Sequence, residues 1–507
     1  MLASDKIRKI EDLGRELSAL RAGKKVVQCH GVFDLLHIGH IRYLERARAL
    51  GDILVVTVTP DRYVNKGPGR PEFGEDLRAE AIAALDCVDY VAINEWPMAV
   101  EPIRILKPDF YVKGSDYKDA EADRTGGIAL EEEAVISVGG ETVFTDEITY
   151  SSSSLINRYL SSYPEEAKSF LTDFSSRHPT EEILGHVEAA SAKKVLVVGE
   201  TIIDEYVYCE AIGKSSKEPM LAVRYLSRER FAGGILAVAN HASNFSSSVG
   251  MVTFLGEDGG YGDFVNEHVN PKVDKHMLYR ANSPTIVKQR YVDSYFFSKM
   301  LEVYDMNDAK LDDAGNEQLC ATLSETIRDY DLVVVVDYGH GMITPEAIEI
   351  LCKEAPFLAV NAQSNAANLG FHTISRYPRA DFVCIAENEM RVEARNRHAA
   401  LDQVVLDVSK RLSCEQIIVT RGKNGCLAYR ESEGFSEIPA LSGQVVDRVG
   451  AGDAFLSVAA PCAAGGAPME VVGFIGNAVA AQAVATVGNR DSVDRNVLFR
   501  HIETLLK

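Results

Sequence analysis

Short apolar runs rich in β-branched residues alternate with helix-period patterns along the first third of the chain. Between the first two runs, Ile41, Leu44 and Ala47 recur at the spacing of one helix face. Strands that alternate with helices in this way predict a mostly parallel sheet with helices on both faces. The predicted strands are residues 26–29, 53–58, 90–94, 110–114 and 142–144.

A second series of apolar runs follows a polar stretch that contains Pro164 and Pro179. Its clearest strands are residues 195–200, 332–337, 382–386 and 417–420. The two series share no fixed-period repeat, so the sequence predicts two unlike α/β domains. We place the first at residues 1–162, a connecting segment that ends in a helix at 163–190, and the second at 191–507.

Composition narrows the class of protein. Of the 507 residues, 46% are hydrophobic and 25% charged, which is typical of folded globular chains. The net charge of −21 opposes broad binding to nucleic acid. The most apolar late stretch, residues 471–488, is interrupted by Asn477 and Gln482, so we expect a buried helix and no membrane span.

Cysteine use and the N-terminal segment both favour a cytoplasmic protein. Nine cysteines are scattered without a CxxC pair, which suits reduced thiols better than a disulfide framework or a zinc ribbon. The first 25 residues are charged throughout and lack the apolar core of a secretory signal.

The first candidate site is the segment HGVFDLLHIGH, residues 30–40, which follows the first strand and opens a helix. Free amides and the positive end of the helix dipole converge there on anionic oxygen. His37 and His40 lie three residues apart and can share a face, while Gly39 leaves the backbone bare for a nucleotide.

These residues resemble the HxGH signature of cytidylyltransferase-like nucleotidyltransferases, and most closely the adenylyltransferase half of bacterial ADP-heptose synthesis enzymes. The resemblance covers about residues 20–160 and includes VKGSDY at 112–117 and the serines at 151–154. It implies a Rossmann-like domain that uses ATP or CTP with Mg²⁺. Catalytic roles are implied for His37, His40 and Lys113, and nucleotide binding for Gly31, Phe33, Asp34, Gly39, Arg78, Ser151, Ser152 and Ser153.

The second candidate site is DRVGAGDAF, residues 447–455, before an apolar run that predicts a buried helix. Small residues at a helix start expose several amides to one anion. Asp453 stands where a carboxylate can take a proton from an attacking hydroxyl.

This string is similar to the GAGD signature of ribokinase-like, phosphofructokinase-B type carbohydrate kinases, over about residues 190–500. The order of further matches is closest to the heptose-7-phosphate kinase branch. The resemblance implies that Asp453 is the base and that Lys288 and Arg290 meet a substrate phosphate next to the sugar site. It also implies Mg²⁺ near Glu389. The implied nucleotide-binding residues are Gly422, Gly425, Gly450, Ala451, Gly452 and Asn477, and the implied substrate-binding residues are Asp204, Gly233, Gly234, Lys288 and Arg290.

Several positions depart from the kinase pattern. Glu200 replaces an Asp, Ala237 replaces an Asn that meets the sugar, and Ala386 replaces an Asn near the metal. Asn361 begins the segment that replaces an Asp-Pro-Lys. Loss of hydrogen-bonding groups from a sugar pocket changes its specificity or weakens its catalysis.

The sequence therefore predicts an α/β protein with an N-terminal Rossmann-like nucleotidyltransferase domain and a C-terminal ribokinase-like domain. Our leading hypothesis is a bifunctional sugar-phosphate kinase and sugar-1-phosphate nucleotidyltransferase that makes a heptose-like, ADP-linked sugar. In the resembling heptose enzymes the kinase comes first, so the order here reads as reversed. One alternative is a nucleotidyltransferase whose weakened kinase half serves binding, regulation or dimerisation; another is a non-catalytic nucleotide sensor. We expect a homodimer, with sugar phosphates and nucleoside triphosphates as substrates and neither nucleic acid nor membrane as partner.

Overall fold

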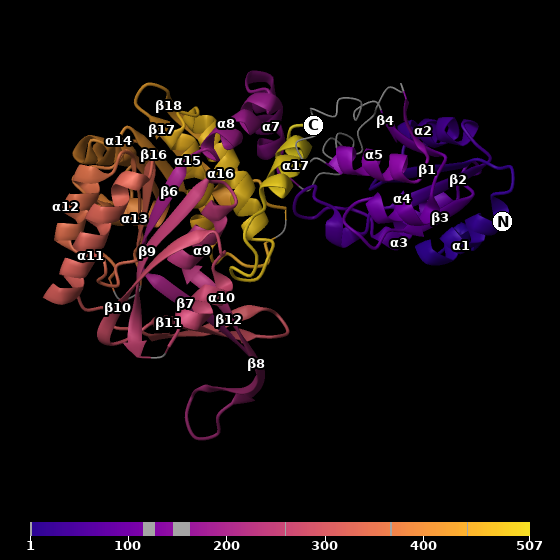
Figure 1. Cartoon of the computed structure of the whole chain (residues 1–507). Helices are drawn as coiled ribbons and strands as arrows, with labels where there is room; N and C mark the ends of the chain where they lie inside the picture. The colour runs from indigo at the N-terminus through magenta and orange to yellow at the C-terminus, as the bar shows by residue number, and fades with distance from the viewer. Residues whose placement is uncertain (1–2, 115–126, 146–162, 259, 366–367, 444) are drawn as a thin grey trace. The chain divides into compact units, whose positions relative to one another are not determined.

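The computed structural model describes residues 3–114, 127–145, 163–258, 260–365, 368–443 and 445–507. The chain divides into two compact units (Figure 1). Unit 1 comprises residues 1–162 and 499–507, and unit 2 comprises residues 163–498.

Unit 1 is built on a five-stranded parallel sheet in the order β3-β2-β1-β4-β5. Every residue of β2 is buried, as the continuous apolar run predicts for a parallel strand covered on both faces. The strands are β1 (Val26–Gly31), β2 (Ile53–Val58), β3 (Tyr90–Ile93), β4 (Phe110–Gly114) and β5 (Glu141–Thr145). The helices are α1 (Ile10–Leu20), α2 (Ile38–Ala49), α3 (Glu75–Ala83), α4 (Val100–Leu106) and α5 (Gly127–Ser137).

Unit 2 contains a nine-stranded sheet in the order β10-β9-β6-β13-β14-β15-β16-β17-β18, antiparallel only from β16 onward. Its strands are β6 (Lys194–Gly199), β9 (Ser248–Asp258), β10 (Val273–Pro284), β13 (Leu332–Asp337), β14 (Leu358–Ala362), β15 (Phe382–Ala386), β16 (Gln416–Thr420), β17 (Cys426–Arg430) and β18 (Gly434–Ile438). The predicted strands in both units are thus present.

Helices lie on both sides of the large sheet, with α11, α12 and α14 on one side and α8, α15 and α16 on the other (Figure 1). The buried core on the α11, α12 and α14 side includes Leu323, Leu351 and Val405. The helices of this unit are α7 (Glu165–Arg177), α8 (Thr180–Ala190), α9 (Ile235–Ser243), α10 (Gly262–His268), α11 (Asp313–Thr326), α12 (Pro345–Glu354), α13 (Glu387–Glu393), α14 (Leu401–Leu412), α15 (Ala451–Ala464) and α16 (Met469–Ala483). Helix α17 (Arg495–Leu505) follows.

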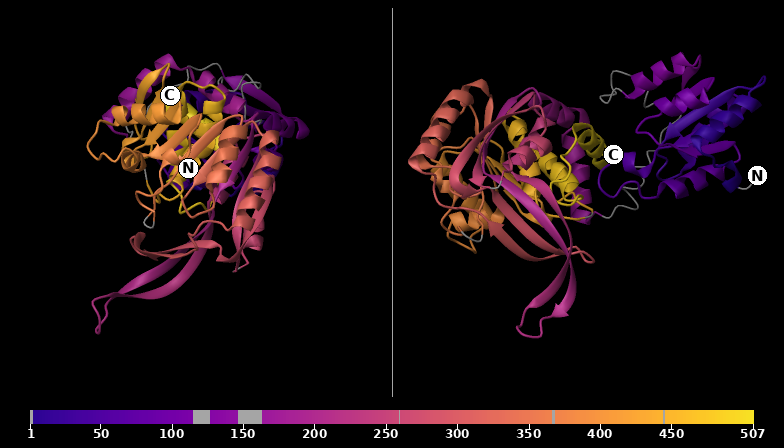
Figure 2. Two further views of the ribbon diagram at one scale, coloured as in Figure 1. Left: turned by 90° about the vertical axis from the view of Figure 1, so that its left-hand side faces the viewer. Right: turned by 60° about the horizontal axis from the view of Figure 1, so that its bottom comes forward.

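A separate four-stranded sheet in unit 2 has the order β12-β11-β7-β8. Its strands are β7 (Thr201–Lys214), β8 (Leu221–Gly234), β11 (Ile286–Asp293) and β12 (Ser298–Asp305). The β7–β8 hairpin extends away from the rest of unit 2 (Figure 2). We call these four strands the lid sheet; the sequence analysis did not predict them.

The segment 163–190 differs from the surface connection that we expected. It forms the two helices α7 and α8. In α7, Phe174 is fully buried and stacks on Phe474 of α16, with ring centroids 4.5 Å apart. The segment is mostly polar, but an apolar side chain at every third or fourth residue gives each helix one face that packs against the domain.

Candidate active sites

The strand order of unit 1 reverses between β1 and β4, so the carboxyl ends of these neighbours face one crevice. The β1 end leads into the loop before α2, and the β4 end carries Lys113. The fold thereby places the histidine segment beside Lys113, although the two are distant in sequence. Phe33 turns the loop with a positive φ of 52°, and a Cβ at Gly31 would lie 3.2 Å from its ring.

His37 and His40 form a stacked pair at the start of α2. Their ring centroids are 4.0 Å apart, and the Phe33 ring meets His40 edge-on at 5.3 Å. His37 is the N-cap residue of α2, and its Nδ1 accepts a hydrogen bond from the Gly39 amide at 3.1 Å. The Gly39 amide is therefore occupied by His37, and the approach of a nucleotide over the bare Gly39 backbone stays a prediction.

The histidine pair is uncharged at neutral pH. Burial lowers the pKa of both rings, that of His40 to about 3. Because Nδ1 of His37 accepts the Gly39 proton, the neutral ring carries its own proton on Nε2. That atom is buried and has no hydrogen-bond partner among the described residues. His37 thus presents a preoriented neutral donor.

Lys113 is held by a carboxylate that the sequence analysis did not identify. Its Nζ lies 2.8 Å from Glu131 Oε2, and both side chains are about nine-tenths buried. Glu131, on α5, also accepts from the Tyr111 hydroxyl at 2.9 Å and from the Ala99 amide at 3.2 Å. Glu131 sits in an ordinary helical pattern, so only the fold reveals this pairing.

Two residues expected to bind nucleotide have structural partners instead. Asp34 is buried and accepts from the amides of Glu72 at 2.7 Å and Phe73 at 3.2 Å, besides pairing with Arg70. Arg78 is fully buried, and its guanidinium donates to the carbonyls of Val32, Thr59 and Phe73 and to Asp61. Both residues anchor loops around the site, because most of their hydrogen-bonding groups are bound to backbone or to other side chains.

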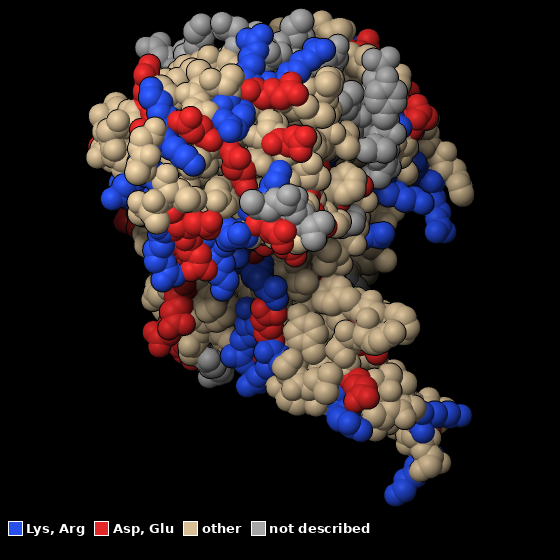
Figure 3. Space-filling view, turned by 90° about the vertical axis from the view of Figure 1, so that its right-hand side faces the viewer, with Lys and Arg blue, Asp and Glu red and all other residues tan. Residues whose placement is uncertain are grey.

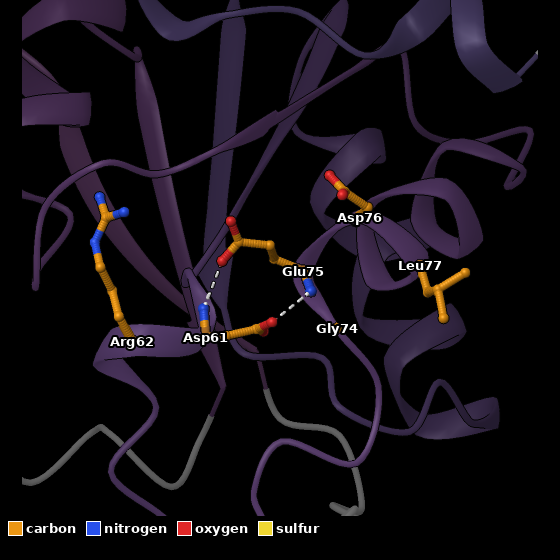
Figure 4. Close-up of a pocket in the computed structure, with 6 residues that line it drawn as sticks. All are labelled: Asp61, Arg62, Gly74, Glu75, Asp76 and Leu77. Atoms are coloured by element: carbon orange, nitrogen blue, oxygen red, sulfur yellow. Dashed lines mark hydrogen bonds between the residues drawn. The ribbon is translucent and has the colours of Figure 1, made fainter. Parts of the chain in front are cut away.

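A shallow pocket beside α3 is acidic, and its chemistry does not suit phosphate. Asp61 and Glu75 exchange hydrogen bonds through each other's backbone amides, at 2.6 and 3.1 Å (Figure 4). Three carboxylates among its lining residues repel anions. The lining residues are Asp61, Arg62, Gly74, Glu75, Asp76 and Leu77. The expected phosphate ligands Ser151, Ser152 and Ser153 lie outside the described residues.

In unit 2, the start of α15 is an open anion site. Gly450 is its N-cap with a positive φ of 83°, and a Cβ there would lie 1.9 Å from the Asn489 Oδ1. The amides of Ala451, Gly452 and Asp453 donate to no acceptor in the described part of the chain. A Cβ on Gly452 would meet nothing within 4 Å, so space remains for a ligand over these amides.

Asp453 lies in the first turn of α15 with one oxygen already bound. Its Oδ1 accepts from the Tyr338 hydroxyl at 2.9 Å and more weakly from the Gln363 side chain at 3.5 Å. Burial, together with the nearby Asp204 charge, raises the pKa of Asp453 to about 7. The described residues give Oδ2 no hydrogen-bond donor. This oxygen is suited to accept a substrate proton near neutral pH.

The expected sugar-side residues meet where β7, β8 and β11 run side by side. Asp204 ion-pairs with Arg290, and a Cβ on Gly233 would lie 2.2 Å from the Asp204 Oδ2, so only glycine leaves room for this carboxylate. Gly234, with a φ of 56°, starts α9. Arg290 also donates to Glu302 at 2.8 Å. Two carboxylates therefore hold the Nε and Nη1 groups of Arg290, and its contact with a substrate phosphate stays a prediction.

Lys288, the other residue expected to meet a substrate phosphate, lies near Asp204 and Asp453. It is buried, with its Nζ 5.3 Å from the centroid of the Tyr304 ring and 5.8 Å from that of Tyr338. Burial lowers its pKa, while Asp204 opposes the shift. It forms no ion pair within the described residues, so its ammonium is a buried positive charge beside Asp453 and Asp204.

Of the residues expected to bind ATP, Gly422 has empty space beside it, whereas Gly425 and Asn477 contact other parts of the chain. Gly422 has a φ of 56° and faces open space. Gly425 has a φ of 77°, and a Cβ there would lie 1.9 Å from the Ile438 carbonyl oxygen, so its role is close packing. Asn477 donates to the carbonyls of Ile438 and Pro439 at 3.3 and 3.0 Å. Its amide nitrogen therefore ties α16 to the end of β18, and its nucleotide-binding role stays a prediction.

Glu389, which the sequence predicts near Mg²⁺, is hydrogen-bonded to two backbone amides. Its Oε2 accepts from the Ala386 amide at 2.7 Å and its Oε1 from the Ser364 amide at 3.1 Å. The Glu389 carboxylate thus caps the start of α13 by binding the amide of Ala386, the residue that replaces the Asn of the kinase pattern. Within the described ranges, no group of three or more His, Cys, Asp or Glu side chains could hold a metal ion.

Glu200, which replaces an Asp of the kinase pattern, binds backbone amides with its carboxylate. It is buried and accepts from the amides of Tyr338 and His340, each at 3.0 Å. Burial and the Asp337 charge raise the pKa of Glu200 to about 7. Ala237 is buried in α9. Ala237 has no hydrogen-bonding side chain where the kinase pattern has Asn, whereas Asp453 and the α15 amides remain in place.

Comparison with protein families identifies both halves. Residues 192–496, more than half of the chain, match the model of the pfkB family carbohydrate kinases. The chain belongs to the pfkB family. Residues 29–158 match the cytidylyltransferase-like model. In this chain the nucleotidyltransferase match precedes the kinase match, as the motifs predicted.

Curated relatives share only part of their length with this chain. It is 40% identical over 148 residues to a bifunctional protein HldE of Syntrophotalea carbinolica, 29% of each chain. It is 47% identical over 118 residues to the HldE of Trichlorobacter lovleyi, 23% of this chain and 24% of the relative. The chain therefore matches less than a third of either relative.

A solved structure supports the fold of unit 2. Phosphofructokinase-2 of Escherichia coli, in complex with potassium, aligns with a TM-score of 0.51 at 15% identity, covering 62% of this chain and all of that one. This likeness confirms the ribokinase-like fold. Among the described residues, no helix has the length and apolar character of a membrane span.

Proposed function

We propose that this protein is a bifunctional enzyme: a sugar-phosphate kinase, and a sugar-1-phosphate nucleotidyltransferase that makes a nucleotide-activated sugar. The observation that carries the proposal is the start of α15, where a buried carboxylate with a pKa of about 7 lies beside unoccupied helix amides. Membership of the pfkB family supports the phosphoryl transfer, and the cytidylyltransferase-like match supports the second reaction.

In the kinase reaction, Asp453 Oδ2 takes the proton of a sugar hydroxyl. The hydroxyl oxygen forms a bond to the γ-phosphorus of ATP, the bond to the β,γ-bridging oxygen breaks, and ADP leaves. The amides of Ala451 and Gly452 stabilise the negative charge that develops on the phosphates. Lys288 is suited to balance charge on the substrate side, because it is buried beside Asp453 and no described residue forms an ion pair with it.

In the nucleotidyl transfer, a sugar 1-phosphate oxygen attacks the α-phosphorus of a nucleoside triphosphate, and pyrophosphate leaves. The nucleophile is already ionised at neutral pH, so the site needs donors and orientation more than a base. His37 Nε2–H is such a donor, and His40 completes the pair. Lys113, held by Glu131, adds positive charge at the end of the adjacent strand.

We further propose a heptose-like sugar and ADP as the linked nucleotide, because the sequence resembles the ADP-heptose enzymes and the relatives carry the name HldE. Mg²⁺ would arrive bound to the triphosphate, and CTP is the alternative nucleotide. We place the reactions in the cytoplasm, where ATP is supplied and the nine free cysteines stay reduced.

We also propose a homodimer formed through the lid sheet. Large apolar side chains are exposed along it, among them Ile212, Tyr225, Leu226 and Leu301. In Figure 3 the extended hairpin is a lobe of mostly uncharged side chains. The lid sheet of a second copy of this chain presents the same apolar surface, and pairing of the two sheets would cover both. Sedimentation at micromolar concentration tests this, and a monomer would contradict it.

The direct test incubates the protein with ATP, Mg²⁺ and a panel of sugar phosphates. We expect release of ADP with a sugar 7-phosphate and of pyrophosphate with a sugar 1-phosphate. Release of neither product with any substrate would overturn the proposal. Pyrophosphate alone would favour the second candidate, a nucleotidyltransferase with a binding or regulatory kinase half, which Ala237 and the capped Glu389 favour.

A further inference from the structure

A buried ion pair joins the lid sheet to the turn that begins the anion site of unit 2. Lys299, on β12, donates to the Asp447 Oδ1. The Asp447 side chain is completely buried, and that of Lys299 is 29% exposed. The pair links two segments that are distant in sequence, and the kinase chemistry described above uses neither residue.

Asp447 organises the chain immediately before α15. Its Oδ1 also accepts from the Val449 amide at 3.1 Å, one residue before the Gly450 N-cap. Its Oδ2 accepts from the Tyr206 hydroxyl and from the Gly488 amide at 3.0 Å. The carboxylate thus binds together the 447–450 turn, the 488–490 segment and the lid strand β7.

The negative charge of Asp447 requires a nearby positive charge, because Asp447 lies next to the anion site at the start of α15. A buried carboxylate three residues before an anion-binding helix start would repel a bound phosphate in a medium of low dielectric constant. The Lys299 ammonium compensates that charge and lies 5.3 Å from the centroid of the Tyr206 ring. The compensating charge comes from the lid sheet, so the anion site is complete only when β12 is seated on the body of unit 2.

We propose that Lys299 is a positioning residue for phosphate binding: through Asp447 it fixes the 447–450 turn and makes the anion site depend on a docked lid sheet. This inference rests on the proposed kinase function for its kinetic readout. Lys299 touches no reacting atom, so its effect must appear through the binding of ATP.

The first experiment measures kinetics of the full-length protein with Lys299→Met, which keeps the side-chain length but removes the charge. We expect kcat/KM for ATP to fall by about 30-fold or more, because removing one member of a buried charge pair leaves the other uncompensated. The KM for ATP should rise while that for the sugar phosphate changes little. Lys299→Arg should retain most of the activity, and Lys214→Met, at the exposed far end of the hairpin, should behave as the parent.

The second experiment does not need turnover. Hydrogen exchange of a peptide covering residues 447–455 is measured with and without ATP and Mg²⁺. In Lys299→Met we expect faster exchange without ligand and loss of the protection that ATP gives, with both retained in Lys299→Arg. Unchanged exchange in Lys299→Met, or an equal loss in Lys214→Met, would overturn the role of Lys299. Absence of turnover in the parent with normal exchange behaviour would instead count against the proposed kinase function.

Discussion

Replacing Tyr338 by Phe tests the assignment of Asp453 as the base. The Tyr338 hydroxyl donates to Asp453 Oδ1 at 2.9 Å inside a buried site and thereby favours the ionised carboxylate. A hydrogen bond to a charged group contributes about 1.5–3 kcal/mol, and one pKa unit corresponds to about 1.4 kcal/mol. The variant should therefore raise the pKa of Asp453 by about 1–2 units above its present value near 7.

The sign of the effect follows from the role of the group. A base must be ionised, so the kinase rate of the parent should rise with pH through about 7 and then level off. In Tyr338→Phe the rising limb should move to higher pH by about 1–2 units, with a smaller change in the plateau.

The assay follows ADP release between pH 5.5 and 9.5 at saturating ATP. Tyr377→Phe is the matched control, because that buried hydroxyl binds Asp337 at 2.8 Å and not Asp453. Its profile should keep the position of the parent's rising limb. A Tyr338→Phe profile that coincides with the parent's, or an equal shift in Tyr377→Phe, would refute the reasoning.

Three further predictions concern other parts of the molecule. His37→Ala should lower pyrophosphate release by about 10²–10³-fold, as expected for a lost oriented donor, while ADP release continues; equal losses in both reactions would contradict this. Glu131→Gln removes the carboxylate charge that lies 2.8 Å from the Lys113 ammonium and should lower the free energy of unfolding of unit 1 by about 3–5 kcal/mol, measured by urea denaturation, and an unchanged midpoint would count against the ion pair. Gly425→Ala places a Cβ 1.9 Å from the Ile438 carbonyl oxygen at a positive φ and should lower the melting temperature, whereas Gly434→Ala, whose Cβ meets nothing, should cost less.

The α/β organisation could be predicted because it depends on local patterns. The runs at 53–58 and 332–337 are buried along their whole length, which is what a parallel strand with helices on both faces requires. The lid sheet could not be predicted in this way. The outer half of β8 is largely exposed and its polar and apolar residues follow no regular alternation, so it carries little signal of a buried strand.

The motifs located the helix starts but not the partners of their charged residues. His37, His40 and Asp453 stand at the expected positions because a helix start is defined by local sequence. The backbone partners of Asp34, Arg78 and Glu389 could not be predicted, since whether a charged side chain meets the backbone depends on loops folded against it. Glu131 and Lys299 were missed for the same reason, because their partners are distant in sequence.

The central claim is that two separate helix starts each serve one phosphate reaction. The most direct measurement is a ³¹P NMR time course of the full-length protein with ATP, Mg²⁺ and both sugar phosphates, comparing Asp453→Asn with the double variant His37→Ala, His40→Ala. We predict that Asp453→Asn stops ADP formation but not pyrophosphate release, and that the histidine variant does the reverse. Continued ADP formation by Asp453→Asn, or loss of both reactions in folded forms of either variant, would contradict the claim.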